Sequence, residues 1–308
     1  MINRVLIRMK VMQLVYSYYQ KEDRSLAAAE KELMFSLEKS YELYHFLLLL
    51  MVELTEMQQR KLDNARHKHL ASATDKNPNL KFIDNLFIQH LKSDLQFQKY
   101  CSNQKISWVN EQEFLRKMLD QILTSNLYTE YIASADISYQ SDREFWRAIF
   151  KNIILEDEYL AETLESISVY WNDDLEVIGT FVLKSIKQFK PENGVNQPLL
   201  PMFKDVDDRD FAVNLFSKSI LNEQEYRKLI DSHTQNWEMD RIAFMDIVIM
   251  QTAVAELMCF PTIPVNVTLN EYIELAKSYG TPKSGVFVNG VLDSLINQLK
   301  SEKKIMKN

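Results

Sequence analysis

Residues that interrupt helices are sparse in this chain. Its 308 residues include only five glycines and seven prolines, while 46% of them are hydrophobic and 26% are charged. Glycine and proline break helices, whereas the abundant leucine, glutamate, lysine and methionine favour them. The sequence therefore predicts an all-α protein with enough apolar side chains to form a packed core.

Apolar residues recur at three- and four-residue steps along most of the chain, as they do in amphipathic helices. The segments with this period are residues 2–20, a long stretch from Asp23 or Ser25 to about Leu70, residues 80–100, and three or four pieces between Trp108 and Lys190. Each of these segments is predicted to be helical.

The helix-breaking residues gather between Lys190 and Pro201, which marks the clearest linker. A run of aspartates from Asp205 to Asp210 then introduces another helix, because acidic side chains are favoured at the positive end of a helix. A metal site is the weaker interpretation of this run, since it lacks the glycine turn and the final glutamate of a calcium loop.

The stretch from Asn236 to Leu299 predicts a compact unit of three helices. An apolar segment over residues 242–260 is followed by two shorter amphipathic segments, which residues 280–285 separate. The last two helices are expected to be held in place by residues at their ends.

Four residues are the expected helix ends of this unit. Thr268 and Glu271 have the spacing of a capping box, in which each side chain accepts a hydrogen bond from the backbone at the start of a helix. Gly280 is expected to end that helix in the left-handed conformation. Ser284 is expected to cap the last helix.

Several motifs near the two ends of the chain form a recognisable pattern. They are residues 13–16 (QLVY), Trp237, Asp240, Arg241, residues 263–280 (IPVNVTLNEYIELAKSYG) and residues 287–293 (FVNGVLD). Together these motifs resemble the NusB family of transcription antitermination proteins, over roughly the first twenty residues and the last hundred.

The resemblance implies an all-α helical bundle of the NusB-like type, built from both ends of the chain and enlarged by inserted helices. The expected organisation is a first core helix at 1–22, an inserted or elaborated helical region at 23–190, a linker at 191–203, the C-terminal core helices at 204–300 and a basic tail at 301–308.

Basic residues of the first helix are the leading candidates for RNA binding. Arg4, Arg8 and Lys10 are predicted to lie on about one face, and guanidinium groups suit phosphate oxygens. In the NusB family this position holds an arginine-rich motif that binds the boxA element of ribosomal-RNA leader transcripts. Val5 and Leu6 stand here where the family often has further arginines. The alternative is an ordinary solvated face of an amphipathic helix.

Residues in the C-terminal helices complete the candidate sites. Lys283 and Ser284, in the turn before the last helix, are further RNA-binding candidates. NusB proteins also bind the ribosomal protein NusE, and Tyr16 and Asp246 match positions used for that contact. Gln251 departs from the family, which usually has arginine at this position.

The resemblance implies a transcription antitermination or ribosomal-RNA biogenesis factor. It would bind boxA-type leader RNA jointly with NusE in the transcription elongation complex, by assembly and not by catalysis. The sequence has no glycine-rich phosphate loop, nucleophile elbow or zinc-ligand set, so no enzyme, cofactor or metal is expected. The alternative is a helical protein-interaction module that kept the fold and has little RNA affinity.

Charge and cysteine content limit the cellular setting. The formal net charge of −7 argues against nonspecific coating of nucleic acid, although both ends of the chain are basic. Two distant cysteines, Cys101 and Cys259, suggest no disulfide framework, so a cytoplasmic protein is expected. The longest apolar run, residues 46–52, is much shorter than the ~20 residues of a membrane span.

Overall fold

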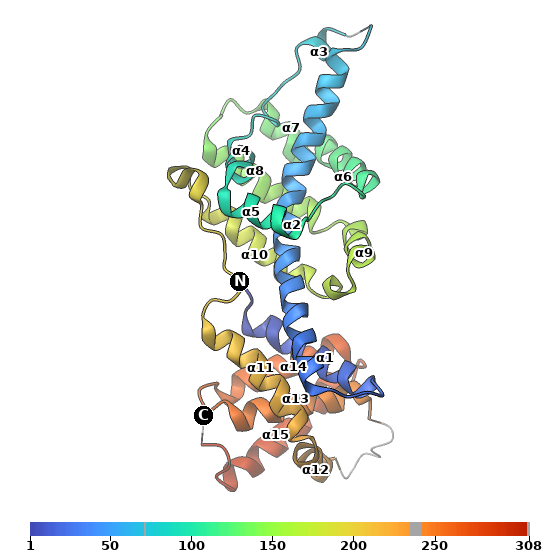
Figure 1. Cartoon of the computed structure of the whole chain (residues 1–308), viewed down its shortest axis with the longest axis vertical. Coiled ribbons are helices and arrows are strands. Elements are labelled where there is room, and N and C mark those ends of the chain that lie inside the picture. The colour runs from blue at the N-terminus through green and yellow to red at the C-terminus, as the bar shows by residue number, and fades with distance from the viewer. Residues whose placement is uncertain (71, 235–241, 307–308) are drawn as a thin grey trace. The chain divides into compact units, whose positions relative to one another are not determined.

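A computed structural model describes residues 1–70, 72–234 and 242–306 (Figure 1). These residues form helices joined by turns, and an isolated parallel bridge pairs Ile2 with Phe203. The all-α prediction is confirmed. Trp237, Asp240 and Arg241, which belong to the family-like pattern, lie outside the described residues.

The helices follow one another along the chain with short connections. In order they are α1 (Arg4–Gln20), α2 (Leu26–Arg66), α3 (Ala73–Lys76), α4 (Leu86–Ser93), α5 (Leu95–Gln104), α6 (Gln112–Thr124), α7 (Asn126–Ala133), α8 (Tyr139–Ile149), the π-helix η1 (Phe150–Ile154), α9 (Glu158–Ile167), the 3₁₀-helix η2 (Val169–Trp171), α10 (Leu175–Gln188), the 3₁₀-helix η3 (Pro191–Asn196), α11 (Val206–Leu221), α12 (Glu223–His233), α13 (Phe244–Cys259), α14 (Val265–Tyr279) and α15 (Ser284–Ser301). Within the described ranges, no helix has both the length and the apolar character needed to cross a bilayer.

The chain separates into two compact units. The middle unit consists of Met1 and Glu38–Met202, and the terminal unit consists of Ile2–Leu37 and Phe203–Asn308. Helix α2 therefore contributes its first turns to the terminal unit and the rest of its length to the middle unit. The domain boundaries expected from the sequence stay predictions.

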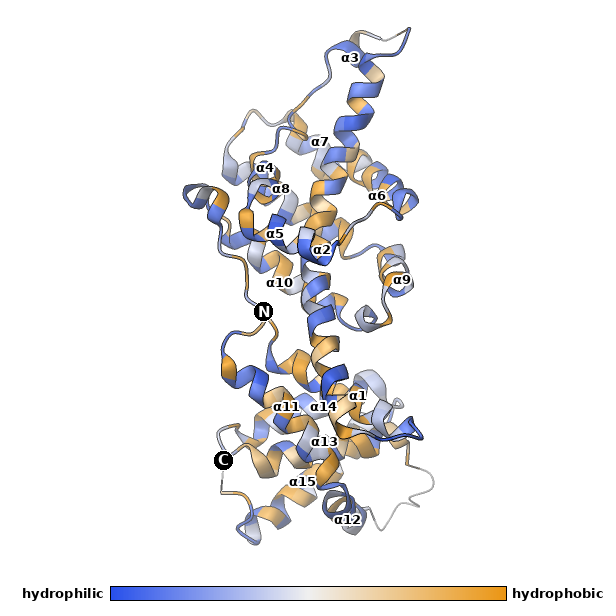
Figure 2. Ribbon diagram, in the orientation of Figure 1, coloured by the Kyte–Doolittle hydropathy of each residue, from blue (hydrophilic) through white to orange (hydrophobic). Residues whose placement is uncertain are grey.

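Helix α13 is the centre of the terminal unit. Residues Val248–Leu257 are all buried, and α1, α11, α12, α14 and α15 pack against this helix. A helix that is apolar on nearly every side needs neighbours on every side, which explains its central position (Figure 2). Because α1 comes from the beginning of the chain, both ends build one core, as the resemblance implied.

The start of α14 differs from the predicted capping box. The helix begins at Val265, directly after Pro264, whose φ of −59° suits a helix start. Thr268 therefore lies inside the helix, and its hydroxyl donates a hydrogen bond to Glu256 on α13. The capping-box prediction was wrong because a buried acceptor on another helix binds this hydroxyl.

The turn between α14 and α15 also differs from the prediction, at both Gly280 and Ser284. Helix α14 does end before Gly280, but the φ of Gly280 is −97°, so this glycine is not in the left-handed region. Ser284 is the first residue of α15 and makes no capping bond within that helix. Its hydroxyl instead accepts a hydrogen bond from the backbone N–H of Thr281 at 2.8 Å.

Residues 80–100, predicted as one helix, contain a break at Asp94. This residue has a ψ of 125°, ends α4, and accepts a hydrogen bond from the N–H of Phe97 to begin α5. Its second carboxylate oxygen accepts from the N–H of Gln197, which follows η3. Aspartate favours the N-cap of a helix over its interior. Asp94 therefore breaks the predicted helix in two, although the period of the apolar residues continues through this position.

A buried histidine lies in the aromatic core of the middle unit. The ring of His45 stacks on Tyr100 with 3.6 Å between centroids, and its Nδ1 lies 3.0 Å from the carbonyl oxygen of Tyr41. Nε2 is buried without a hydrogen-bond partner. Burial lowers the pKa of His45 from its ordinary 6.5 to about 4.

This shift predicts an acid-sensitive middle unit. Because the unfolded chain binds a proton at His45 near pH 6.5 and the folded chain only near pH 4, the histidine destabilises the fold increasingly as pH falls through this window. By pH 4.5 the loss attributable to His45 should be roughly 2 to 3 kcal/mol. A His45→Phe variant keeps the ring and cannot titrate.

Tryptophan fluorescence is the appropriate probe for this prediction, because Trp108, Trp146 and Trp171 are buried in the middle unit. Urea unfolding of both proteins at pH 7 and pH 4.5 gives the pH-dependent difference in the free energy of unfolding. Identical pH dependence in the wild type and the variant would contradict the assignment to His45.

Candidate nucleic-acid interface

Arg4 lies at the surface of the terminal unit, on the first turn of α1. The helix starts here because the side chain of Asn3 accepts a hydrogen bond from the N–H of Leu6. The Arg4 side chain is 40% exposed, its Nε lies 3.4 Å from Asp208 Oδ1, and its guanidinium lies 5.0 Å from the centroid of the Phe211 ring. The Asp208 side chain is 14% exposed, and at 3.4 Å the pair is long, so it contributes little to stability and Arg4 can exchange Asp208 for another anion.

Arg8 lies in the core and not on the surface. Its Nε and Nη2 donate to the two carboxylate oxygens of Glu256 at 2.7 and 2.9 Å, and the two side chains are 3% and 0% exposed. Thr268 and Tyr272 donate their hydroxyl groups to the same carboxylate, at 2.8 and 3.3 Å. Burial alone would lower the pKa of Arg8, but the hydrogen bonds and charge of Glu256 raise it above its ordinary value.

Lys10 is also buried, with 2% of the residue exposed. The sequence predicted that Arg4, Arg8 and Lys10 form one exposed cationic face. The structure does not form this face, because Arg8 and Lys10 are buried and only Arg4 is exposed to solvent. Arg8 faces α13, whose Glu256 lies 248 positions away, while Arg4 one turn earlier contacts Asp208 and Phe211 of α11. Lys10 follows Arg8 by two residues and so lies about 200° around the helix from it, not on the same face.

The remaining candidates gather around the N-terminal end of α13. Asp246 accepts a hydrogen bond from the hydroxyl of Ser284 at 2.7 Å, and both residues are buried. Burial raises the pKa of Asp246, and its Oδ1 has no hydrogen-bond partner. These two residues fasten the turn before α15 to α13, while Lys283 in that turn is exposed.

Tyr16 lies at this same end of α13. Its ring centroid is 5.5 Å from that of Phe244, and the side chain is half-buried. Helix α1 thus runs antiparallel to α13, with Arg8 beside Glu256 and Tyr16 beside Phe244.

The structure places the sequence-predicted residues in two groups and not in one patch. Arg4 lies towards the C-terminal end of α13, because Phe211 beneath it contacts Phe260 with 4.9 Å between ring centroids. Lys283 lies at the N-terminal end, beside Ser284. The 16 residues of α13 separate these ends by about 24 Å.

A cation that was not selected from the sequence lies near the Arg4 group. Lys304 lines a cavity of about 200 Å³ together with Leu257, Met258 and Pro261, at the C-terminal end of α13. The chain turns back here because the N–H of Lys304 donates to the carbonyl oxygen of Leu299. The excess of lysines after residue 299 indicated a cationic segment, but it did not predict the turn that brings Lys304 to this cavity.

Gln251, where the family usually has arginine, is buried and joins several helices. Its amide nitrogen donates to the Tyr19 hydroxyl at 2.7 Å and to the carbonyl oxygen of Ser219 at 2.6 Å, and its oxygen accepts from Arg227 Nε at 3.1 Å. The Arg227 guanidinium lies 4.8 Å from the ring centroid of Tyr19 and 5.7 Å from that of Phe244. A cation from α12 is therefore held beside residue 251.

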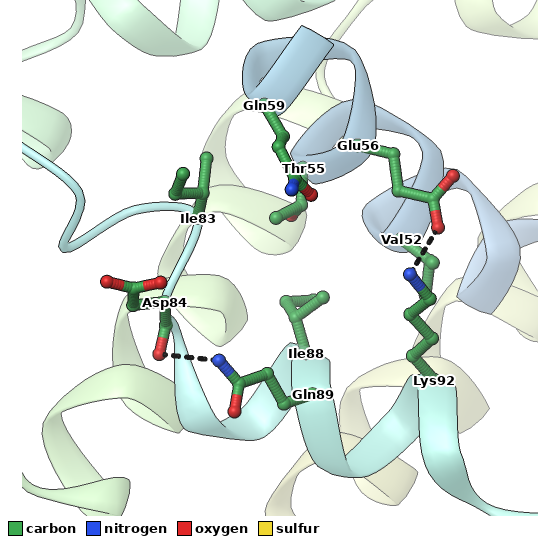
Figure 3. Close-up of a pocket in the computed structure, with 9 residues that line it drawn as sticks. All are labelled: Val52, Thr55, Glu56, Gln59, Ile83, Asp84, Ile88, Gln89 and Lys92. Carbon is green, nitrogen blue, oxygen red and sulfur yellow. Dashed lines mark hydrogen bonds and ion pairs between the residues drawn. The ribbon is translucent and has the colours of Figure 1, made fainter. Parts of the chain in front are cut away.

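The middle unit contains a cavity of about 190 Å³ between α2 and α4 (Figure 3). Apolar side chains and polar groups share its wall, which consists of Val52, Thr55, Glu56, Gln59, Ile83, Asp84, Ile88, Gln89 and Lys92. Glu56 pairs with Lys92 at 2.8 Å across one side. The cavity can hold water or a small polar group, and its carboxylates make it unsuitable for phosphate.

Comparison with known proteins gives a consistent result. The model of the NusB family matches residues 180–297. The transcription antitermination protein NusB of Salinibacter ruber is 39% identical over 108 residues, which are 35% of this chain and 68% of that protein. The NusB proteins of Koribacter versatilis and Geotalea daltonii are 41% and 36% identical over 103 and 134 residues, covering 33% and 43% of this chain and 70% and 88% of those proteins. No solved structure gives a significant match.

The burial of Arg8 predicts that it stabilises the fold. An Arg8→Met variant removes the buried guanidinium that donates two hydrogen bonds to Glu256, which should lower the free energy of unfolding by about 3 to 5 kcal/mol. Arg4→Met is the matched control, because Arg4 is exposed, and it should cost less than about 1 kcal/mol.

Urea unfolding followed by circular dichroism, with hydrogen exchange of α13 peptides as the local probe, measures this difference. Equal stability of the two variants would show that the Arg8–Glu256 pair does not hold α1 in place.

Proposed function

This chain belongs to the NusB family of transcription antitermination proteins, and from this membership we propose that it binds boxA-type leader RNA together with ribosomal protein NusE. The observation that carries the proposal is the shared stretch itself, since residues 180–297 contain α11 to α14 and most of α15, which form much of the terminal unit. The proposed mechanism is noncovalent assembly within the transcription elongation complex.

We assign the direct phosphate contacts to the exposed cations of the terminal unit. Arg4 can engage two phosphate oxygens at once, and its present partner Asp208 is held only at 3.4 Å. Lys283 presents an ammonium group from a turn that Asp246 and Ser284 fix in position. Arg8 supports this surface indirectly, by holding α1 against α13.

The contact with NusE is assigned to the N-terminal end of α13. Tyr16 is half-buried there, and Arg227 with Tyr19 and Phe244 lines a shallow depression of about 250 Å³ beside it. Aromatic rings with an adjacent arginine are typical of the residues that dominate protein interfaces. Asp246 is buried, so its proposed part is to position the turn and not to touch the partner.

The burial of Arg8 and Lys10 favours a second candidate function. With fewer exposed cations on α1 than the resemblance implied, the chain would be a helical protein-interaction module with low RNA affinity. The two functions differ in one measurable property, which is whether boxA RNA binds and how steeply its affinity falls with salt.

The proposed function predicts that an Arg4→Gln/Lys283→Gln variant binds boxA RNA less tightly. Two lost phosphate contacts should reduce the slope of log affinity against log salt by about 1.4 in magnitude, with little change in the melting temperature. Fluorescence anisotropy over a salt series, with NusE present, measures the RNA affinity and its salt slope, and thermal unfolding measures the melting temperature. A wild-type chain that does not prefer boxA RNA over a scrambled RNA would support the protein-interaction module instead.

The proposed NusE contact predicts a separate effect of Tyr16→Ala. This variant should weaken NusE binding by about tenfold or more, as expected for a truncated aromatic anchor, while its RNA affinity without NusE stays unchanged. Calorimetric titration with NusE gives the affinity. Val267→Ala, at an exposed position on α14, is the control, and equal affinities for the two variants would reject the assignment.

A further inference from the structure

The C-terminal end of α2 carries a concentration of cations that the proposed function does not use. Residues 57–81 contain six lysines and arginines against two aspartates, although the whole chain has a net charge of −7. This segment belongs to the middle unit and precedes residues 180–297, which match the family. We define the basic tip as Arg60, Lys61, Arg66 and Lys68.

The residues of the basic tip are exposed at the point where α2 ends. Arg60, Lys61 and Asn64 lie on one face, because residues three and four apart are neighbours on a helix. Within the middle unit, this end of α2 extends past α6 and α7 towards α3, and most of its residues are hydrophilic (Figures 1 and 2). One cation in the last turn would satisfy the negative end of the helix dipole, so the helix end alone does not account for four.

The acidic partners of the basic tip are half-buried or exposed, and two of its three ion pairs are long. Arg60 Nη1 lies 3.6 Å from Glu56, and Arg66 Nη1 lies 3.8 Å from Asp63. Lys61 pairs with Asp120 at 2.9 Å, but both side chains are about half exposed or more. Exposed ion pairs contribute about 0 to 1 kcal/mol, so a polyanion with a higher charge density can displace these carboxylates.

The chemistry around the cations selects the kind of polyanion. Gln59, Asn64 and His67 are exposed between them, so polar groups surround the charges on the helix. A helix that binds a membrane surface needs a broad apolar face beside its cations. The basic tip lacks such a face in the described residues and suits the phosphates of a polar polymer.

We propose that the basic tip is a second RNA-binding element, which contacts the backbone phosphates of leader RNA without reading its sequence. This inference rests on the proposed function, since boxA binding brings the transcript to the protein. The basic tip then adds contacts to RNA outside boxA and raises the affinity through electrostatic attraction.

The test uses the full chain and a variant of the basic tip, Arg60→Gln/Lys61→Gln/Arg66→Gln/Lys68→Gln. The control variant, Arg116→Gln/Lys117→Gln/Lys184→Gln/Lys187→Gln, removes the same charge from exposed positions elsewhere in the middle unit. Anisotropy titrations use a long leader RNA containing boxA and the same RNA with boxA scrambled. Melting temperatures establish that both variants are folded.

The basic-tip variant should bind both RNAs about tenfold more weakly than the control variant, with a salt slope smaller by about 2 to 3 in magnitude. Equal affinities of the two variants for both RNAs would overturn the proposal, as would wild-type binding to phosphatidylserine vesicles with none to RNA. Failure of the proposed function gives a different result, because the wild type would then bind the two RNAs equally while the basic-tip variant still lost affinity for both.

Discussion

The ion pair between Arg8 and Glu256 joins the first helix of the chain to the helix at the centre of the terminal unit. Removing two charges from water is costly, and the cost is offset only when the geometry and the surrounding hydrogen bonds are good. Thr268 and Tyr272 supply those hydrogen bonds. A shift of α1 by one residue would rotate its side chains by about 100° and break both hydrogen bonds between the two buried charges. The pair therefore fixes the register of α1.

This register determines what the surface of the terminal unit can present. With Arg8 beside Glu256, Tyr19 reaches Gln251 and Tyr16 reaches Phe244, so the contacts of α1 with α13 are spread over about three turns. Arg4, one turn before Arg8, is then left at the edge of this contact. An arginine used inside the core cannot also bind a phosphate, so the electrostatics of the surface depend on a small number of exposed cations.

Local sequence patterns predicted much of this fold, but they could not predict contacts between residues that are far apart in the sequence. The apolar period gave α1 and α2 to within a few residues, and the side chain of Asp205 accepts from the N–H of Asp208 at the start of α11, as its position suggested. Asp94 was missed because a cap inside a periodic segment leaves the period intact. The burial of Arg8 was missed because no local pattern reveals a partner 248 positions away.

A core built from both ends of a chain has a consequence for synthesis on the ribosome. Helix α1 is made before α13, which completes its surroundings and follows only after more than two hundred further residues. At about 5 to 20 residues per second, the nascent α1 waits on the order of ten seconds or longer with Arg8 still hydrated. The middle unit, whose residues are contiguous apart from Met1, is complete before α13 exists. Helix α1 is thus translated before the middle unit but reaches its native environment only after that unit is complete.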